Sequence, residues 1–509
     1  MSRCRLHVVV AGIVTVTTVW SQESIRVSVT IDRGEDLGQS FGSLFEAESA
    51  DGRFILGAGF SNAYNTRYRA NRHAVQFYIR PVKESRQLEV KQLPRPTDHL
   101  TGAYLFERGG NIYSTYGGLQ QWNAARNRWE PGADKGGTQE SMRLGHGVLT
   151  FGHSRVLWND SVILEPPAEG TYQLFFYANG HLCFYHVNRK DGPYRKYTDD
   201  TDGFSRLYAV PWSPKDRAVD LERAITFLLP VVGETTFAWG QLGNQIVTGS
   251  NIGGFYRFQN GKWDKLLEPD LTTSYQLYSS LGFGDKLLMG QYPTGRLFEY
   301  DGEQIRDLNE WPPVPPGVRG SAREAQTTCI YGGELIAGVW PWGELWRYSP
   351  DAAKWDLDRR MFDHPAPSDK VTHPYDIENE GNSPQNRWGQ RVTSLVPNRT
   401  SLFISTSAKA PYEWEPGTYS FLEPDLWKSY GLVYEATMPG HLSIPIKWTE
   451  GKTTLSFVVS EDRMTILQDG RLLGSAKSGS GVANPVNVKW GDGLFGPHAC
   501  QSLSGTIEQ

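Results

Sequence analysis

Short alternations of apolar and polar residues, framed by glycine, recur along the chain and predict strands joined by tight turns. Residues 243–249 read Gly-Asn-Gln-Ile-Val-Thr-Gly, and the phrase returns at 284–290 and 332–338. Each copy is followed by a glycine-led aromatic run, at 254–258, 295–300 and 343–348. A period of about 40 to 50 residues is typical of four-stranded propeller blades. Because one such meander cannot bury its own face, the copies are expected to stack around an axis.

Weaker copies of the phrase begin near Gly52, Gly110, Gly147, Gly180 and Ser401. With the three clear copies they make eight candidates, and we predict seven blades because one weak copy would be an extra hairpin. The predicted fold is therefore all-β, with a β-propeller of about seven blades over residues 40–420. The glycines that end the clear copies, Gly249, Gly290 and Gly338, should occupy equivalent positions in successive blades.

Strand patterns also flank the predicted propeller. Residues 22–39 contain one alternating segment, 25–31, and residues 421–509 are predicted to form a small β-rich, jelly-roll-like extension. In that extension Asp469-Gly470 marks a hairpin turn between two strands. Since the extension is short for an independent sandwich, we expect residues 25–31 to pair with it near 455–459 rather than with the last blade near 402–405. This pairing would join the two chain ends and help to close the ring.

The hairpin at 468–474 and the strand at 505–507 resemble the closing strands of laminin-G and concanavalin-like jelly rolls. The resemblance covers about the last sixty residues and implies a sugar-binding module. The alternative is that the tail packs against the propeller and recognises nothing. The propeller itself resembles kelch and sialidase-type propellers in period and in aromatic-glycine phrasing. The Ser-x-Asp-x-Gly-x-x-Trp box of sialidases is present only in degenerate form, at residues 349–355. The Trp-Asp pairs of the chain lack the Gly-His that accompanies them in WD repeats. Kelch-like is therefore the closer description, and this resemblance implies no activity.

The first residues have the pattern of a signal peptide. Arg3 and Arg5 precede an apolar stretch at 8–19 that is too short to span a bilayer, and Val19 and Ser21 suit cleavage before Gln22. Residues 1–21 are therefore predicted to be removed and the protein to be secreted or periplasmic. The alternative is a buried first strand or a retained anchor. No later segment is expected to cross a membrane.

Charge and cysteine content narrow the classes of partner. The net charge of −5 over 509 residues gives no sign of nucleic-acid binding. Once Cys4 is removed with the signal peptide, three cysteines remain, so at least one thiol is unpaired and a disulfide scaffold is not indicated.

A first candidate site lies between residues 146 and 197, where histidine, tyrosine and arginine are concentrated. His146, His186, Tyr194 and Arg195 are the candidate catalytic residues of a polysaccharide lyase. Such an enzyme needs a cation to neutralise a uronate and a base to remove its C5 proton. In residue type, this set resembles the His, Tyr and Arg residues that ulvan-degrading lyases use. The alternative is that strands of a propeller are simply rich in these residues for packing.

The same stretch contains two candidate metal ligands. His181 and Cys183 point to one face of a strand by period two, and His186 points to the other. Zinc is the metal that suits this pair, but a third ligand would have to come from another blade. The sequence requires no cofactor.

A second candidate site is a basic, aromatic segment near the start of the predicted propeller. Arg67, Tyr68, Arg69 and Arg72, together with Arg189 farther on, are the candidate ligand-binding residues, because guanidinium groups bind carboxylate and sulfate in a bidentate way. An ordinary hydrated loop or a surface that binds a partner is the alternative.

These patterns favour a secreted propeller that recognises an extracellular ligand, most simply a glycan. Two alternatives remain open: an enzyme that degrades acidic polysaccharide, as a lyase before a hydrolase, and a scaffold that binds another protein. Convergence of His146, His186, Tyr194 and Arg195 in one cleft would favour an enzyme, and their dispersal would favour binding.

Overall fold

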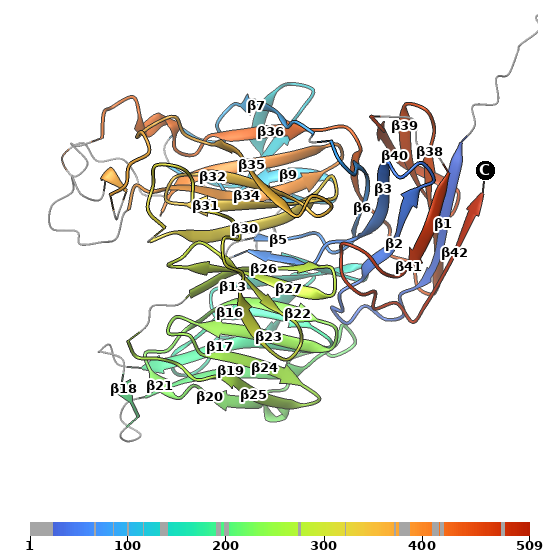
Figure 1. The fold of residues 1–509 in the computed structure, drawn as a ribbon. Coiled ribbons are helices and arrows are strands. Elements are labelled where there is room, and N and C mark those ends of the chain that lie inside the picture. Colours follow the sequence, from blue (N-terminus) through green and yellow to red (C-terminus); the bar gives the residue numbers. More distant parts are fainter. Residues whose placement is uncertain are drawn as a thin grey trace, which may run out of the picture.

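The computed structural model describes residues 24–508 apart from 66–67, 85, 99–100, 116, 133–140, 190–194, 198–202, 273–275, 321, 371–372, 376–386, 410–416, 418–421 and 480–483. Antiparallel strands form nearly all of its regular structure. Two one-turn 3-10 helices, η2 (Leu221–Arg223) and η3 (Trp427–Ser429), lie in connections between strands. The strands group into a propeller and a two-sheet sandwich that stand side by side (Figure 1).

Seven four-stranded units make up the propeller in the described part of the chain, which confirms the predicted fold class. Blades 1 and 2 contain β8 (Leu105–Arg108), β9 (Asn111–Ser114), β10 (Gln120–Asn123) and β11 (Arg128–Pro131), then β12 (Ser141–Leu144), β13 (Gly147–Gly152), β14 (Arg155–Trp158) and β15 (Ser161–Leu164). Blade 3 contains β16 (Thr171–Ala178), β17 (His181–Arg189), β19 (Gly203–Pro211) and β20 (Ile225–Leu228), and blade 4 contains β22 (Thr236–Leu242), β23 (Gln245–Ser250), β24 (Phe255–Gln259) and β25 (Lys262–Leu267). A two-stranded ribbon, β18 (Arg195–Lys196) with β21 (Val231–Val232), lies beside blade 3.

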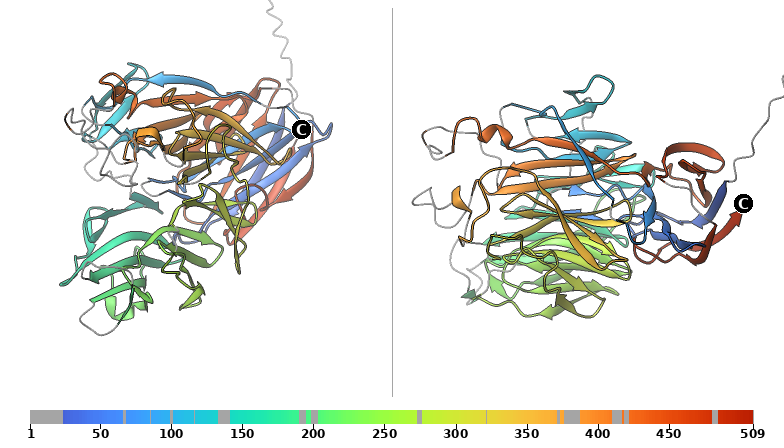
Figure 2. Two further views of the ribbon diagram at one scale, coloured as in Figure 1. Left: turned by 60° about the vertical axis from the view of Figure 1, so that its left-hand side comes forward. Right: turned by 45° about the horizontal axis from the view of Figure 1, so that its top comes forward.

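The last three blades carry two of the clear sequence repeats. Blade 5 contains β26 (Gln276–Phe283), β27 (Lys286–Tyr292), β28 (Leu297–Tyr300) and β29 (Ile305–Asp307), and blade 6 contains β30 (Glu324–Tyr331), β31 (Glu334–Trp340), β32 (Glu344–Ser349) and β33 (Lys354–Arg360). Blade 7 is made of β34 (Gln390–Asn398), β35 (Ser401–Ala408), β36 (Val433–Thr437) and β7 (Glu89–Leu93). Because β7 precedes blade 1 in the sequence and completes blade 7, it ties the two ends of the propeller chain together. The first strands of blades 4 to 7 and of blade 1 contact their neighbours in turn, so they lie nearest the axis. In the right-hand view of Figure 2 the sandwich, which holds the C-terminus, lies beside the propeller.

The repeated glycines occupy equivalent positions, as predicted. Gly249, Gly290 and Gly338 lie in the second strands of blades 4, 5 and 6, opposite the start of the third strand in each case. A Cβ on any of them would collide with the first strand of the next blade, at 2.4 Å from Leu277, 2.1 Å from Ala325 and 2.6 Å from Val392 respectively. The glycines therefore allow neighbouring blades to pack closely, which explains why the phrase ends on glycine.

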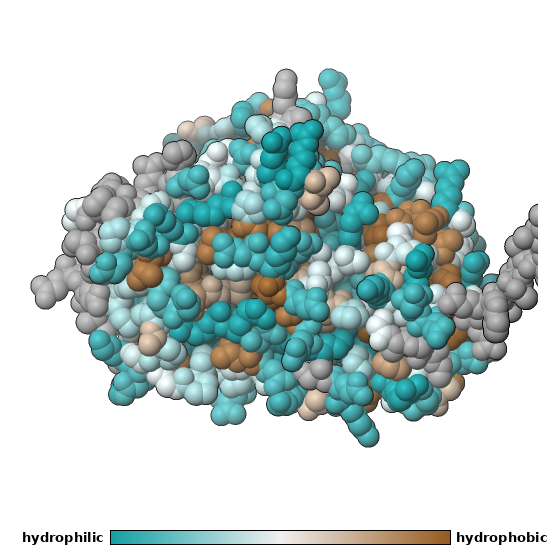
Figure 3. Space-filling view, turned by 90° about the horizontal axis from the view of Figure 1, so that it is seen from above, coloured by the Kyte–Doolittle hydropathy of each residue, from teal (hydrophilic) through white to brown (hydrophobic). Residues whose placement is uncertain are grey.

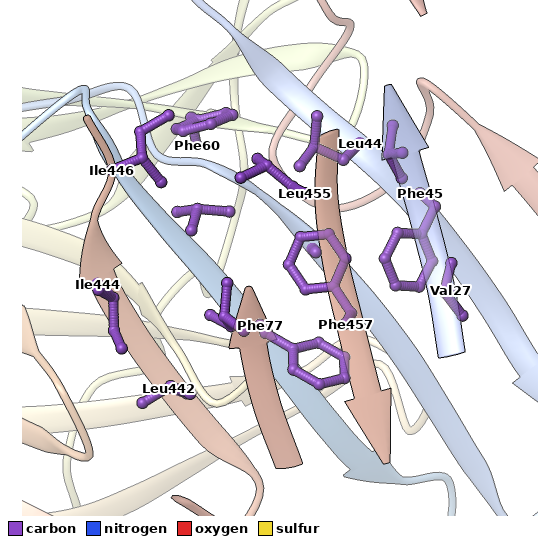
Figure 4. Packing of buried hydrophobic residues seen from close by; sticks show 14 of the residues in the cluster. Val27, Leu44, Phe45, Phe60, Phe77, Leu442, Ile444, Ile446, Leu455 and Phe457 are labelled. Atoms are coloured by element: carbon purple, nitrogen blue, oxygen red, sulfur yellow. The ribbon is translucent and has the colours of Figure 1, made fainter. Parts of the chain in front are cut away.

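The sandwich combines both ends of the chain. Its outer sheet has the order β40 (Arg471–Lys477), β39 (Arg463–Gln468), β38 (Lys452–Val459), β1 (Ile25–Asp32) and β42 (Ser502–Glu508). Its inner sheet, next to the propeller, has the order β37 (His441–Pro445), β6 (Ala74–Pro81), β3 (Phe54–Phe60), β2 (Gly42–Ser49) and β41 (Pro485–Trp490). Apolar side chains from both sheets, among them Val27, Phe45, Phe77 and Phe457, fill the space between the sheets (Figure 4).

The sandwich confirms one prediction and corrects others. β1 pairs with β38 in the expected segment, with Val27 opposite Phe457. The predicted propeller boundary at residue 40 is wrong, because β2, β3 and β6 belong to the inner sheet, and the boundary at 421 is also misplaced because β36 belongs to blade 7. The weak copy at Gly52 is strand β3, which is the surplus eighth candidate. Ring closure depends on β7 rather than on β1, and β7 was missed because Glu89–Leu93 has little apolar alternation.

The sandwich covers one face of the propeller through the turns that join the first and second strands of the blades. In blades 2 and 3 the Gly145 N–H donates to Asp36 Oδ2 (2.7 Å) and the Gly180 N–H donates to the carbonyl of Leu37 (2.7 Å). The turns of blades 5, 6 and 7 bond in the same way to Leu494, His441 and Ser443. The opposite face of the propeller points away from the sandwich.

One segment of the sandwich enters the propeller at its axis. β4 (Ala63–Asn65) and β5 (Tyr68–Arg69) form a hairpin, and β4 pairs with the innermost strand of blade 5. The Asn65 side chain accepts a hydrogen bond from the Thr328 N–H of blade 6 (3.0 Å), and the ring of Tyr64 contacts that of Phe176 in blade 3. β4 is therefore packed against the inner strands of the propeller.

Candidate functional site

A cavity of about 590 Å³ lies where the sandwich meets blades 2 and 3. The sandwich contributes the connection after β1 and the loop between β37 and β38, and the propeller contributes turns of both blades. The residues that give this cavity its chemistry are Glu35, Asp36, His146, Trp158, Lys215, Trp448 and Glu450. Its volume is in the range of ordinary small-ligand sites.

The floor of the cavity is a buried ion pair. Arg72 Nη1 donates to Asp36 Oδ1 (2.6 Å), and His73 Nε2 lies 2.7 Å from Asp36 Oδ2, which also accepts the Gly145 N–H. Burial alone would raise the pKa of Asp36, but Arg72 and His73 outweigh it and hold that pKa well below its usual range. Burial lowers the pKa of His73 to about 4, so the imidazole is neutral near pH 7 and donates to the carboxylate. The floor is thus a fixed, fully paired anion rather than an available acid or base.

Trp158 is half-buried and provides apolar wall surface, whereas Trp448 is only 7% exposed and adds little. The six-membered ring of Trp158 lies over Gly147, where an added Cβ would come within 2.2 Å of the indole. Trp448 is held from below by His73, which stacks on it at 5.3 Å, and by the Arg33 guanidinium, 4.3 Å from the ring centroid. Each indole is therefore fixed before any ligand arrives, which reduces the entropy cost of binding.

The rim of the cavity is charged and open to solvent. Lys215 Nζ lies 3.0 Å from a Glu35 carboxylate oxygen and so bridges blade 3 to the sandwich. Glu450, from the loop before β38, and His146, from the β12–β13 turn of blade 2, are both exposed. Together with the walls, the rim offers hydrogen-bonding groups around aromatic surface.

The three candidate catalytic residues that the structure describes, His146, His186 and Arg195, lie apart from one another. His146 lies on the sandwich-facing turn of blade 2, whereas His186 lies in the later half of β17, remote from that face. The ring of His186 is nearly buried, with Nε2 2.9 Å from the carbonyl oxygen of Glu169, and burial lowers its pKa. Arg195 pairs with Val232 in the β18–β21 ribbon, and Tyr194 is outside the described residues.

The candidate metal ligands share one face of β17, as period two predicts, but they serve the packing of blade 3 against blade 4. Cys183 is fully buried and burial raises the pKa of its thiol, while the ring of His181 meets the edge of Phe258 at 4.9 Å. Within the described residues no three His, Cys, Asp or Glu side chains are grouped as metal ligands. Nothing in the described structure supplies the third zinc ligand.

The candidate ligand-binding arginines have different surroundings. Arg72 belongs to the cavity floor, where its second Nη donates to the carbonyl of Gln39. Arg69 and Tyr68 form β5 at the axis, and Arg67 is outside the described residues. Arg189 is exposed at the end of β17, on the side away from the sandwich. Those members of the set that the structure describes do not form one surface.

Among the residues at the cavity, His146 and Arg72 were singled out from the sequence and the others were not. Trp158 belongs to the weak copy that begins near Gly147, and Trp448 and Glu450 lie in the loop before the predicted tail strands. A local signal was available only for Trp158, because Gly147 at the start of β13 leaves room for its indole.

From above, apolar residues at the surface form small separate patches among hydrophilic ones (Figure 3). None of the helices in the part of the chain described here is long and apolar enough to cross a membrane.

The known proteins that resemble this chain are found among solved structures. No family model and no curated protein matches the chain. Among solved structures it is similar to YCF48 bound to D1 peptide, with 14% identity over 70% of this chain and 96% of that one and a TM-score of 0.36. It is also similar to PorZ of the type-IX secretion system of Porphyromonas gingivalis (11%, 86% and 81%, TM-score 0.19) and to the tricorn protease (10%, 87% and 58%, TM-score 0.22).

All three TM-scores are below 0.5, so the propeller assignment rests on the strand pairing of this chain itself. The finer resemblances to kelch, sialidase and laminin-G families find no confirmation among these structures.

Proposed function

We propose that this β-propeller protein recognises a small saccharide in the cavity between the sandwich and blades 2 and 3. The observation that carries the proposal is the pairing of the pre-positioned Trp158 indole, beside the nearly buried Trp448, with a rim of carboxylate, amine and imidazole groups. Sugar rings expose C–H faces that pack on an indole and hydroxyl groups that bond to a polar rim, so both parts of the ligand find a counterpart.

Binding is favoured over polysaccharide cleavage by the positions of the candidate catalytic residues. His146 and His186 lie toward opposite faces of the propeller, and Arg195 belongs to a separate ribbon, so no described cleft joins a base, an acid and a uronate-binding cation. The only carboxylate at the cavity floor, Asp36, is occupied by Arg72 and His73. We therefore expect no unsaturated products when the protein is incubated with acidic polysaccharides and their absorbance is followed.

Saccharide binding can be measured by the change in tryptophan fluorescence during titration with a panel of mono- and disaccharides. We expect at least one neutral or basic sugar to bind, and Trp158→Ala to lose that binding because it removes one wall. Trp129→Ala, which removes a half-exposed tryptophan from blade 1, should bind as the unaltered protein does. If no sugar in the panel binds, or if Trp129→Ala and Trp158→Ala behave alike, the proposal is wrong.

We further propose that the protein is exported after removal of residues 1–21, on the basis of the sequence pattern before Gln22. These residues are outside the described structure. N-terminal sequencing of protein recovered outside the cytoplasm should begin at or near Gln22. Recovery of an intact Met1 from the cytoplasm would overturn the proposal.

A further inference from the structure

We infer that a second cavity, at the contact between the sandwich and blade 7, binds a zwitterion: a free α-amino acid or a short peptide with both ends free. This site is separate from the saccharide cavity and does not depend on the proposed saccharide function. The inference is carried by the polar side chains around the second cavity, which leave their hydrogen-bonding groups and charges available to a ligand.

The second cavity has a volume of about 340 Å³ and forms where the chain leaves blade 7 for the sandwich. The connection between β36 and β37 provides part of its lining, and the β34–β35 turn, the start of β7 and the end of β40 provide the rest. The polar side chains of the lining are Glu89, Thr400, Thr437, His441 and Lys477. The size of the cavity suits a ligand of one or two amino-acid residues.

His441, the buried member of this set, has an N–H group without a partner. Its side chain is 1% exposed, and its ring contacts that of Tyr331 at 4.1 Å. Nδ1 accepts a hydrogen bond from the Gly332 N–H (3.0 Å), so the neutral imidazole carries its hydrogen on Nε2. Nε2 is buried and has no hydrogen-bond partner among the described residues. A buried donor of this kind is costly, and an acceptor atom of a ligand in the cavity would satisfy it.

Two opposite charges line this cavity from different domains. Lys477 ends β40 of the sandwich, and Glu89 begins β7 of blade 7. Neither side chain forms an ion pair, with the other or with any further residue in the described part of the chain. The two charges are therefore held apart instead of neutralising each other. A ligand that carries its own separated charges complements this arrangement.

The charges nearest behind the lining are already paired. Arg86 Nη2 lies 2.9 Å from Glu334 Oε1. Arg347 lies between two carboxylates, with Nη1 3.7 Å from Glu334 Oε2 and Nε 3.4 Å from Asp358 Oδ1. Each of these arginines has a carboxylate partner, so the charges that a ligand meets are the two in the lining.

The groups of the lining match the two ends of an amino acid. The carboxylate of the ligand accepts from the His441 N–H and the Lys477 ammonium, and the ammonium of the ligand donates to the Glu89 carboxylate. Met438 and Ala476 also line the cavity and provide apolar contact for a small aliphatic side chain. A ligand with only one charged end would leave one charge of the lining without a partner and should bind more weakly.

The test is isothermal titration calorimetry with valine and with valyl-valine, each also in N-acetylated and in C-terminally amidated form. We expect a zwitterion to bind, and the tighter of the two identifies the ligand as a free amino acid or as a peptide. Acetylation of the amine should weaken binding about threefold to fivefold, as for one exposed ion pair. Amidation of the carboxylate should weaken it about tenfold, because the charge-assisted bond to His441 is also lost.

Charge-removing variants locate the site. Glu89→Gln should weaken binding of the zwitterion but not of its acetylated form, and Lys477→Gln should weaken binding of the zwitterion but not of its amide. Glu461→Gln and Lys452→Gln, at exposed sandwich residues that do not line the cavity, should bind normally. Trp158→Ala should also bind normally, which separates this site from the saccharide cavity.

Two results would overturn the inference and leave the saccharide proposal untouched. One is that no ligand of the panel binds, or that the zwitterions bind no more tightly than both of their blocked forms. The other is unchanged affinity for the zwitterion in both Glu89→Gln and Lys477→Gln, which would place the ligand elsewhere.

Discussion

The same sandwich meets the propeller in two contrasting ways, at blade 6 and at blade 2. At blade 6 the contact is closed by buried charge pairs: Arg80 Nε lies 2.9 Å from Asp351 Oδ2, and Arg86 Nη2 lies 2.9 Å from Glu334 Oε1. At blade 2 the Gly145 N–H bonds to Asp36, and a cavity of about 590 Å³ lies beside it. The contact at blade 6 is closely packed, whereas the contact at blade 2 leaves a cavity.

The contacts at blade 6 and at blade 2 therefore have different roles in the protein. The buried pairs at blade 6 set the orientation of the sandwich, because guanidinium and carboxylate groups taken out of water are tolerated only in well-matched geometry. With that orientation set, loops of the sandwich are held at a fixed distance from blades 2 and 3. Walls from two domains can then enclose a ligand site that neither domain contains alone.

Acid should weaken both contacts, and this is the largest effect we predict. Burial lowers the pKa of His73, at the cavity contact, to about 4 and that of His441, at the blade 6 contact, to about 3. The unfolded chain, with ordinary histidines near 6.5, takes up protons first as the pH falls, so stability is complete above that value and decreases below it. The two residues together should reduce the free energy of unfolding by about 3 kcal/mol per pH unit between 6.5 and 4.

Urea unfolding at a series of pH values measures this slope. His441→Gln and His73→Gln keep a side chain that can hydrogen bond to Gly332 and Asp36 respectively, and each should lower the slope by about 1.4 kcal/mol per pH unit. His153→Gln, at an exposed histidine, should leave it unchanged. Equal slopes in all four proteins would contradict the prediction.

Removal of a charge from the blade 6 contact should cost about 3 kcal/mol of unfolding free energy. Arg80→Ala leaves the Asp351 carboxylate without its partner and removes the hydrogen bond to the Gly333 carbonyl (2.6 Å). Arg53→Ala breaks the exposed pair with Asp51 in the same sandwich and should change stability by less than about 0.5 kcal/mol. Chemical denaturation of both variants checks the contrast, and similar losses would mean that the blade 6 pairs do not hold the domains.

A single methyl group at the cavity contact should have a small effect on stability and a larger one on binding. In Gly147→Ala the new Cβ would displace the Trp158 indole, at a cost of about 1 kcal/mol in stability and about tenfold in saccharide affinity. Gly152→Ala, at the other end of β13, meets only Arg155 at 3.8 Å and should bind normally. Tryptophan-fluorescence titration compares the two variants, and unchanged affinity in Gly147→Ala would argue against Trp158 as a wall.

Much of the propeller could be predicted from the sequence because its blades are local. Strand alternation and the glycines at 249, 290 and 338 are readable within about fifty residues, and the structure assigns each glycine the same contact with the next blade. The Asp469-Gly470 turn was readable for the same reason, since both residues take positive φ. The cavity was not readable, because Trp158 and Trp448 come from different domains and only His146 among the candidates lines it.

The sequence by itself determined the strand period, the seven blades and the single turns, because side-chain alternation and positive-φ glycines act over a few residues. Only the tertiary structure decided which distant strands would pair. Ser28 and Ser456, 428 residues apart, face each other because the apolar faces of β1 and β38 had no other surface to bury against. The same long-range choice placed β2, β3 and β6 in the sandwich, gave blade 7 its outer strand β7, and left the cavity at blade 2.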